Sequence, residues 1–585
     1  MIIEVVVFWS VLTVLFLGLG AGAVCCCRWS PQIGMLEIWL GWAIWIMVLQ
    51  VWNLFLPVDW RAFACLGVFG STGLVICRKE IKRIVSGRQF FFGALLVVLS
   101  ACWLAGHTTN QPQNFDSGAY HLSSVRWAKE YAVVPGLGNL YGHLAFNQSY
   151  FLYVALLDIG SFSHKSHQVA SGLLILWTLA KCFRALALLG SGDKVVAPWH
   201  VFDALMVVPV FQYVVYSENA SSPTPDVGVF VLGILVASEL MRFLSPLEMA
   251  RRQEGGAIAR IAPLVLIALV GITVKLSFAV TAMATVLILL FGGGRKTTRQ
   301  ECVRLGLVYL ACVTLILVPW MIRGVVLSGY PVFPATIGAF PVDWRVPVKD
   351  AHHIAEYIRM WPWNMSRYIP SESGRCIPTE FIGTMKGYWL LLMFAGRYYQ
   401  DTVIVPLALS VAGLLCGVWI RRNRAKSTPG GFKSLYFAVP LAGLVYCFII
   451  APLPRFAGAS FWTLGLGAVV WALMGLDRRG VVMGVVLIST LLFAHEIVLS
   501  EFVRPWKRDS GPARKVPMSE RMTESGLRVY VAFPVDGRPW DTSPWDSPLP
   551  ASTSCNPRLA LRVPGELAKG FKIVTTPESE VRSPN

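Results

Sequence analysis

The sequence predicts an all-α polytopic membrane protein with a small β-containing segment near its C-terminus, and three observations lead to this fold class. The 585 residues are 55% hydrophobic and only 14% charged, whereas soluble globular proteins carry about a quarter charged residues. Apolar runs of roughly 18 to 22 residues recur along the chain, each long enough to cross a hydrocarbon core as a helix. The basic residues behind the net charge of +18 lie mainly beside these runs and in the tail. This follows the positive-inside rule, so no nucleic-acid partner is expected.

The apolar runs predict a bundle of about fourteen membrane-spanning helices. The first run, MIIEVVVFWSVLTVLFLGLGAGAVCCC, lacks a basic n-region and is too long for a signal peptide, so we interpret it as a retained span. We place the spans near residues 5–25, 34–55, 61–77, 90–106, 166–189, 200–216, 226–244, 260–274, 276–291, 303–322, 402–420, 434–452, 457–475 and 480–499.

Five basic clusters orient these spans, because short cytoplasmic loops are enriched in Lys and Arg. With the spans above, all five clusters face the cytoplasm and both termini face the outside. The clusters are Arg78, Lys79, Lys82, Arg83 and Arg88; Arg251, Arg252 and Arg260; Arg295, Lys296 and Arg299; Arg421, Arg422, Arg424 and Lys426; and Arg478 with Arg479.

One apolar stretch, Tyr150 to Ser163, is too short for a span, and counting it as a crossing would invert every later basic cluster. We interpret it as a re-entrant or interfacial helix. The predicted organisation is therefore N-terminal transmembrane helices (1–106), a first large outer loop with interfacial helices (107–165), a transmembrane bundle (166–322), a second outer loop (323–401), C-terminal transmembrane helices (402–500) and an outer tail (501–585). Polar chemistry is concentrated on the outer side.

The first outer loop contains a turn, NFDSG, followed by the amphipathic stretch AYHLSSVRWAKEYAV. Helical spacing of its apolar residues predicts a helix at the membrane interface, which suits its aromatic side chains. Asp116 then lies at the mouth of the membrane, just before the helix begins. Two interpretations are open for Asp116: a functional carboxylate, or a helix cap with Arg126 as a plain surface cation.

Three cations on the outer side are candidates for binding an anionic group. Lys275 lies between two spans, where an ionisable residue suggests function but could also be a lysine that snorkels from a helix end. Arg323 and Arg455 end or join spans on the side where the positive-inside rule does not place arginine. Together they suggest a phosphate site, while headgroup anchoring would explain each one alone.

Other outer residues have both a functional and a structural explanation. Glu218 and Asp226 could supply a second acidic group, although a cap on the following span is the simpler role for Asp226. His121 and His143 could bind hydroxyl groups or assist proton transfer, although histidines that only pack within loops are commoner. No cluster has the spacing of metal ligands, so a divalent metal is possible but has no support.

The second outer loop and the tail complete the outer side. The loop is rich in Pro, Tyr and Trp, which suits a lid beside a lipid-facing groove; Tyr330 and Trp344 could stack on sugar rings, or anchor at the interface. The tail contains strand-like pieces, LRVYVAF, RLALRV and FKIVTT, which predict a small β-containing cap on the outer face.

Several motifs carry a resemblance to a known class of proteins. They are NFDSGAYHL, VVPGLGNLYGHLAFNQSYF, SSPTPDVGVF, TVKLS, SGYPVFP, VDWRVP, PRFAG and WDSPLPASTSCNPRLALR. With them the chain resembles uncharacterised bacterial polytopic proteins that accompany surface-polysaccharide genes and are grouped with the GT-C glycosyltransferases, distant relatives of the protein mannosyltransferases and the aminoarabinose transferase of lipid A. The resemblance implies a GT-C-like helical bundle whose first large outer loop carries an essential acidic residue. Asp116 matches that position, but three spans precede the one that enters the loop, and the loop lacks the acidic pair of many relatives.

The resemblance implies an integral membrane glycosyltransferase that moves a sugar from a polyprenyl-phosphate carrier to a glycan or glycolipid acceptor on the outer face of the bacterial inner membrane. Such a transfer needs a base for the acceptor proton and cations for the departing phosphate. We assign Asp116 as the base and Lys275, Arg323 and Arg455 to the donor phosphate. Contacts to substrate are assigned to Tyr120, His121, Arg126, His143, Asn147, Glu218, Asp226, Tyr330 and Trp344. No cofactor is required.

Two other functions stay open at this point. A glycan polymerase or ligase would use lipid-diphosphate donors and would favour paired outer arginines over a carboxylate base. A transporter or lipid-carrier flippase is usually built from inverted repeats with broken helices at the membrane midplane. In this sequence the polar residues gather at one face instead.

Overall fold

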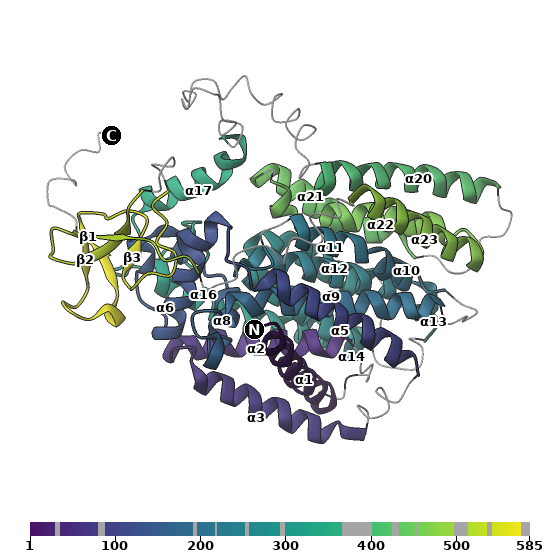
Figure 1. The fold of residues 1–585 in the computed structure, drawn as a ribbon, viewed down its shortest axis with the longest axis horizontal. Coiled ribbons are helices and arrows are strands. Elements are labelled where there is room, and N and C mark those ends of the chain that lie inside the picture. The colour runs from purple at the N-terminus through teal and green to yellow at the C-terminus, as the bar shows by residue number, and fades with distance from the viewer. Residues whose placement is uncertain are drawn as a thin grey trace.

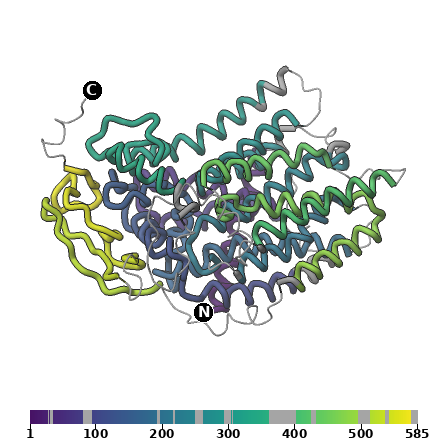
Figure 2. The backbone as a smooth tube through the Cα atoms, turned by 90° about the horizontal axis from the view of Figure 1, so that it is seen from above, coloured from purple at the N-terminus to yellow at the C-terminus, as the bar shows by residue number. Residues whose placement is uncertain are grey.

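The protein is a long bundle of helices with a small sheet region at one end (Figure 1). The computed structural model describes residues 1–27, 29, 35–79, 88–190, 196–216, 219–251, 257–292, 299–364, 400–423, 432–451, 453–496, 513–534 and 541–574. The helices follow the long axis of the molecule, and the strands lie together beyond one end of the bundle in both views (Figures 1 and 2).

The helices confirm the predicted mainly helical fold, because each apolar stretch proposed as a span is helical in its described part. The helices are α1 (Ile2–Cys26), α2 (Met35–Phe55), α3 (Trp60–Ile76), α5 (Arg88–Thr108), α6 (Leu122–Glu130), α7 (Leu137–Leu140), α8 (Tyr150–Leu156), α9 (His167–Gly190), α10 (Pro198–Leu205), α11 (Val207–Tyr216), α12 (Pro225–Phe243), α13 (Pro246–Arg251), α14 (Ala257–Val274), α15 (Ala279–Phe291), α16 (Arg299–Ser328), α17 (Val348–Asn364), α20 (Val405–Asn423), α21 (Ala438–Ile450), α22 (Ser460–Leu473) and α23 (Arg478–Glu496).

Six stretches among the described residues are long and apolar enough to cross a membrane, judged by length and composition. They are Ile2–Cys26, Met35–Phe55, His167–Gly190, Pro198–Val215, Gly306–Ser328 and Asp401–Asn423. Shorter apolar helices accompany them, including Ile261–Val274 and Ser460–Leu473. These helices are consistent with insertion into a membrane.

Small residues bring the first three helices close together. A Cβ atom added to Gly20 or Gly41 would meet backbone of the partner helix at 1.8 Å and 2.0 Å, so α1 and α2 touch through their main chains. Gly18 and Gly73 make the same contact between α1 and α3. Small residues that allow such approach are typical of helix pairs in membranes.

The stretch predicted as re-entrant or interfacial forms the short helix α8 and a single 3-10 turn, Gly160–Phe162, and every residue of α8 is buried. Seven residues of helix span only about 10 Å, which is too short to cross a bilayer. Tyr150 and Tyr153 anchor it against α9 by hydrogen bonds to Ser171 and to the Ala170 carbonyl. The helix is thus a packed element inside the bundle.

The tail forms two small sheets, and this confirms the predicted C-terminal β-containing region. Strand β2 (Arg528–Ala532) pairs antiparallel with β1 (Met518–Met522) and parallel with β3 (Ala551–Ser552). Strand β4 (Leu559–Leu561) pairs antiparallel with β5 (Phe571–Ile573). Strands β2, β4 and β5 fall within the three pieces predicted from the sequence.

The tail packs on the first outer loop. The Phe571 N–H donates to the Pro135 carbonyl at 2.9 Å, and the Phe571 ring meets Trp127 of α6 edge-on. The Trp545 backbone N–H donates to the Gly118 carbonyl at 2.9 Å, and a Cβ atom added to Gly118 would lie only 2.4 Å from the Trp545 indole ring. The segment that carries Asp116 is therefore covered by residues from the far end of the chain.

Candidate functional site

Asp116 ends the turn predicted from NFDSG, and asparagines hold this turn in place. The Asp116 backbone N–H donates to the Asn114 side-chain oxygen at 2.9 Å, and the Asn114 amide donates to Asn219 at 3.0 Å. Directly after Asp116 the chain forms one turn of π-helix, Ser117–His121, before α6 begins. Single π-helical turns are rare and occur frequently at functional sites.

The Asp116 side chain pairs with an arginine and caps no helix. Its carboxylate makes no capping hydrogen bond, and Oδ2 accepts a hydrogen bond from Arg455 Nη1 at 2.9 Å. The other oxygen, Oδ1, has no hydrogen-bond partner within the described ranges. The pair is only partly covered, with the Asp116 side chain 25% exposed and that of Arg455 32%. One carboxylate oxygen thus stays available to a ligand.

A second ion pair, between Lys275 and Asp226, lies beside the first. Asp226 is in the first turn of α12, while the capping oxygen belongs to Thr224, which accepts from the Asp226 N–H. The Lys275 ammonium donates to Asp226 Oδ1 and does not snorkel away. Lys275 and Arg455 both lie over the ring of Phe456, at 4.8 Å and 5.1 Å from its centre. We call Asp116, Asp226, Lys275 and Arg455 the Asp116 cluster.

The electrostatics of the cluster keep Asp116 ionised. Burial by itself would raise the pKa of Asp116, but the positive charges of Arg455 and then Lys275 oppose it, and the pKa lies below the ordinary value. Burial works against the charge of Arg455 too, yet Asp116 and Asp226 raise its pKa above the ordinary range. Both groups therefore carry full charge at neutral pH.

Aromatic rings and two neutral histidines surround the inner side of Asp116. His121 is 1% exposed, with its Nδ1 at 3.4 Å from Ser117 Oγ. Burial lowers the pKa of His121 and of His143 to about 4, so both rings are neutral at pH 7. Tyr120 joins them, with its ring 4.4 Å from that of His121 and 5.3 Å from that of His143. These side chains form a continuous group behind the carboxylate.

A cleft opens beside the Asp116 cluster. Arg455 and Asp226 line it together with Asp401, Asn219, Tyr213 and Trp462. Asp401 comes from the short π-helical turn before α20, and its side chain is 3% exposed. The cleft thus combines cationic, acidic and aromatic groups that arrive from distant parts of the chain.

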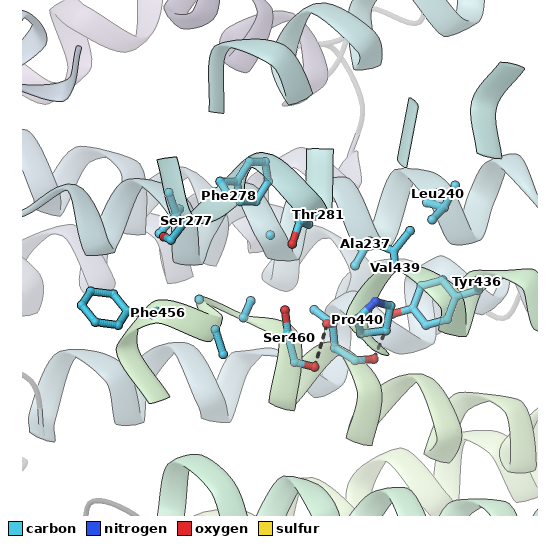
Figure 3. A pocket seen from close by; sticks show the side chains of 16 residues that line it. Ala237, Leu240, Ser277, Phe278, Thr281, Tyr436, Val439, Pro440, Phe456 and Ser460 are labelled. Carbon is cyan, nitrogen blue, oxygen red and sulfur yellow. Dashed lines mark hydrogen bonds between the residues drawn. The ribbon is translucent and has the colours of Figure 1, made fainter. Parts of the chain in front are cut away.

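A second, mainly apolar groove lies between helices α12, α15, α21 and α22, and Figure 3 shows its lining. Phe456 lies at one end and Tyr436 at the other, with the hydroxyl groups of Ser277, Thr281 and Ser460 between them. Gly458 lines both spaces. The groove therefore begins beside the residue on which Lys275 and Arg455 are stacked.

Arg323 and Asn147, both assigned to the site from the sequence, lie together in a different place. Arg323 is 7% exposed and donates to Asn147 Oδ1 at 2.5 Å and to Asn53 Oδ1 at 3.1 Å. They line a cavity that shares no residue with the cleft. The two outer arginines of the sequence prediction are not side by side.

Three other predicted site residues take part in packing between the outer segments. Arg126 pairs with Glu130 and donates to the Ser547 carbonyl of the tail. The buried hydroxyl group of Tyr330 donates to the Val346 carbonyl. Trp344 stacks with the Arg562 guanidinium at 4.4 Å from the ring centre. The predicted residue Glu218 lies outside the described residues.

Asp401, Asn114 and Phe456 belong to the site but were not singled out from the sequence. Asp401 is an ionisable residue at the start of an apolar stretch, the same signal that selected Lys275. Asn114 and Phe456 carry no charge and lie in ordinary turn sequences, so only the structure reveals them. Within the described ranges, no three His, Cys, Asp or Glu side chains are grouped as metal ligands.

Comparison with known protein families assigns the chain to one family. Residues 1–462 match a family described as a domain of unknown function, DUF8201. The chain belongs to the DUF8201 family. No curated protein and no solved structure matches the chain. The DUF8201 match contains the complete Asp116 cluster, and the strands of the tail follow it.

Proposed function

We propose that this DUF8201 protein is a membrane glycosyltransferase of the GT-C type. It transfers a sugar from a polyprenyl-phosphate carrier to a glycan or glycolipid acceptor on the outer face of the bacterial inner membrane. One observation carries the proposal: Asp116 is ionised, partly exposed and paired with Arg455 beside an open cleft. A carboxylate with a free oxygen and two adjacent cations is the set of groups that this transfer needs.

In the proposed reaction the acceptor hydroxyl group attacks the anomeric carbon of the donor sugar. Its proton passes to Asp116 Oδ1, and the bond between the anomeric carbon and the phosphate oxygen breaks. The electron pair leaves with the lipid phosphate, whose negative charge Arg455 and Lys275 stabilise. A single displacement of this kind inverts the configuration at the anomeric carbon.

The groove beside Phe456 suits the carrier lipid. It runs between helices, its walls are mainly apolar, and it begins next to both cations. A polyprenyl chain in the groove would place its phosphate at Arg455 and Lys275. Tyr213, Phe461 and Trp462 of the cleft offer flat faces for the sugar.

The arrangement of polar contacts supports about fourteen spans with the site outside. Arg478 donates to the Leu189 carbonyl and Lys433 to the Gly292 carbonyl, so contacts at one end of the bundle join segments predicted to be cytoplasmic. The pair of Asp116 and Arg455 joins segments predicted to be outside. One alternating topology accounts for both sets.

A polymerase or ligase that uses lipid-diphosphate donors has less support. That function favours two arginines at one site, whereas Arg323 and Arg455 line separate cavities. Activity that survives Asp116→Asn but is lost in Arg455→Ala would favour it over the transferase.

Reconstituted protein tests the proposal. The purified chain in proteoliposomes is given a panel of polyprenyl-phosphate sugars with a glycan or glycolipid acceptor, and release of the carrier phosphate is measured. We expect release by the wild type with at least one donor and none by Asp116→Asn. Equal turnover by both proteins would remove Asp116 as the base.

A further inference from the structure

Among the residues that the structure describes, Arg323 is a buried cation without an acidic partner. Its guanidinium is held by Asn53 Oδ1, at 3.3 Å from Nε and 3.1 Å from Nη2, and by Asn147 Oδ1, at 2.5 Å from Nη1. No carboxylate oxygen lies within 4.0 Å of the guanidinium in the described part of the chain. All of its bound acceptors are neutral amides.

The two asparagines are fixed in this role by their own hydrogen bonds. The Asn53 amide donates to the Leu56 and Tyr131 carbonyls, and the Asn147 amide donates to the Trp320 carbonyl. Both side-chain oxygens therefore point at Arg323. A guanidinium has five N–H groups, and these bonds use three of them, so two N–H groups remain for another acceptor.

A charge in this position is costly without a counter-charge. Moving an ion out of water costs several kcal/mol even after the protein relaxes, and hydrogen bonds to neutral groups offset only part of this. Lys181, another deeply buried cation, has Asp203 at 2.6 Å and Glu239 at 3.4 Å. Arg323 has no such carboxylate within the described ranges, so the charge balance around it is incomplete there.

The cavity beside Arg323 has room and polar groups for a small ligand. Ser124, His143 and Gln148 line it together with the two asparagines. Buried atoms of this lining, His143 Nδ1 and Gln148 Oε1, have no hydrogen-bond partner among the described residues. The neutral His143 ring can donate one N–H, and a half-turn of the Gln148 amide would present two more.

We propose that the Arg323 cavity binds an oxyanion, a phosphate or a carboxylate group, at a site separate from the Asp116 cleft. The anion supplies the missing counter-charge and accepts the two remaining guanidinium N–H groups. His143 lies between the two sites, because it lines the Arg323 cavity and its ring is 5.3 Å from that of Tyr120. The inference concerns binding alone and does not depend on sugar transfer.

Binding of inorganic phosphate tests the site directly. The full chain is placed in nanodiscs of phosphatidylcholine, with Arg455→Gln as the background so that the cleft does not contribute, and phosphate is titrated by calorimetry. We expect saturable binding of one phosphate per chain. Addition of Arg323→Gln should weaken it at least tenfold, whereas Arg345→Gln, at an exposed arginine of the segment that follows α16, should leave it unchanged. Equal phosphate binding with and without Arg323 would overturn the inference.

A second variant separates ligand binding from a role in holding the fold. Asn147→Asp places a carboxylate against Arg323 and supplies the counter-charge from within the protein. This variant should lose phosphate binding while the protein stays folded, because the new ion pair offsets the lost hydrogen bond to the Trp320 carbonyl. Phosphate binding as tight as in the wild type would contradict the proposal.

Nanodiscs of a second lipid composition show whether the anion comes from a lipid or from solution. The phosphate titration is repeated in nanodiscs that contain phosphatidic acid. If phosphatidic acid abolishes the binding of inorganic phosphate, the occupant of the cavity is a lipid headgroup. If phosphate binding is unchanged, the occupant is a water-soluble group. A parallel titration with acetate shows whether a carboxylate is accepted. All of these results require the same Arg323 site.

Discussion

Two groups of ion pairs lie on the same helix, α12, but at opposite ends. The Asp116 cluster uses Asp226 in its first turn, and a second group uses Glu239 and Arg242 near its last turn, about 20 Å away along the helix. This second group, the Lys181 network, consists of Lys181, Asp203, Glu239, Arg242 and Glu248. Both groups join charges from helices that are distant in the sequence.

The two groups differ in how exposed their ion pairs are, because both groups contain paired charges. The Lys181 ammonium is 2.6 Å from Asp203 and also donates to Ser238, and the side chains of Lys181 and Asp203 are 11% and 3% exposed. Asp116 and Arg455 are 2.9 Å apart but two to ten times as exposed, and a cleft adjoins them. An ion pair alone therefore indicates no function. The open side of the pair makes the Asp116 cluster a candidate for chemistry, and the Lys181 network a candidate for stability.

The largest effect is expected from Asp116→Asn. A positioned base contributes roughly a factor of 10² to 10⁴ to a rate, so turnover of a polyprenyl-phosphate sugar should fall by about 10³ while the protein stays folded. The matched change in the other group, Asp203→Asn, should leave the turnover of folded protein within about twofold of the wild type. A similar loss of turnover in both variants would erase the distinction between the two groups.

The reverse contrast is expected for stability. Lys181→Met leaves buried carboxylates without their cation, which typically costs about 3 to 5 kcal/mol. Arg455→Gln breaks a partly exposed pair, which is worth about 1 kcal/mol or less. Unfolding of both variants in a denaturant titration measures the free energies. Equal losses would show that the Asp116 cluster is as structural as the Lys181 network.

The buried histidines next to Asp116 make the free energy of unfolding depend on pH. Burial lowers the pKa of His121 to about 4 from its ordinary value of 6.5. The unfolded chain then takes up a proton first, so the stabilising contribution is present above pH 6.5 and is lost as the pH falls toward 4. Between pH 7.5 and 5 the loss is about 2 kcal/mol. His143, whose pKa burial also lowers to about 4, adds a similar loss. Denaturant titrations at both pH values should show the combined loss, and His121→Gln should reduce it by about 2 kcal/mol. An unchanged slope in the variant would contradict this prediction.

The smallest effect concerns the acid limit of activity. Arg455 lowers the pKa of Asp116 against the effect of burial, so activity should persist until the pH falls below the ordinary range of an aspartate. In Arg455→Gln the largest effect that opposes burial is lost, so the pKa of Asp116 rises and the acid limb of kcat/KM should move to higher pH. The KM for the donor should also rise by about tenfold, since one of two phosphate contacts is lost. Lys181→Met is the control, in which neither quantity should change.

The helices were predictable from the sequence because hydropathy determines them locally. The strands of the tail were predictable where they contain alternating apolar residues, as in LRVYVAF. Strand β1 was missed, because MSERM has no apolar alternation and pairs only through the backbone and a few side chains. Local composition carries no information about such a strand.

The site was predictable residue by residue but not as an arrangement. Asp116, Lys275 and Arg455 stood out because each is ionisable at the end of an apolar stretch. This signal gives the depth of a residue along the bundle and not the direction in which its side chain points. Arg323 has the same depth as Arg455 but points into a separate cavity, since the packing of α16 against α2 and the first outer loop determines its direction. Asp226 had been given the capping role that Thr224 fills.

The separation of 339 residues between Asp116 and Arg455 also has a consequence for biosynthesis. At about 5 to 20 residues per second, the ribosome needs roughly 20 to 70 s to reach the arginine after the aspartate has been made. During this time the carboxylate is without its partner, and Gly118 is without the indole that later covers it. The Asp116 cluster is thus completed only late in translation.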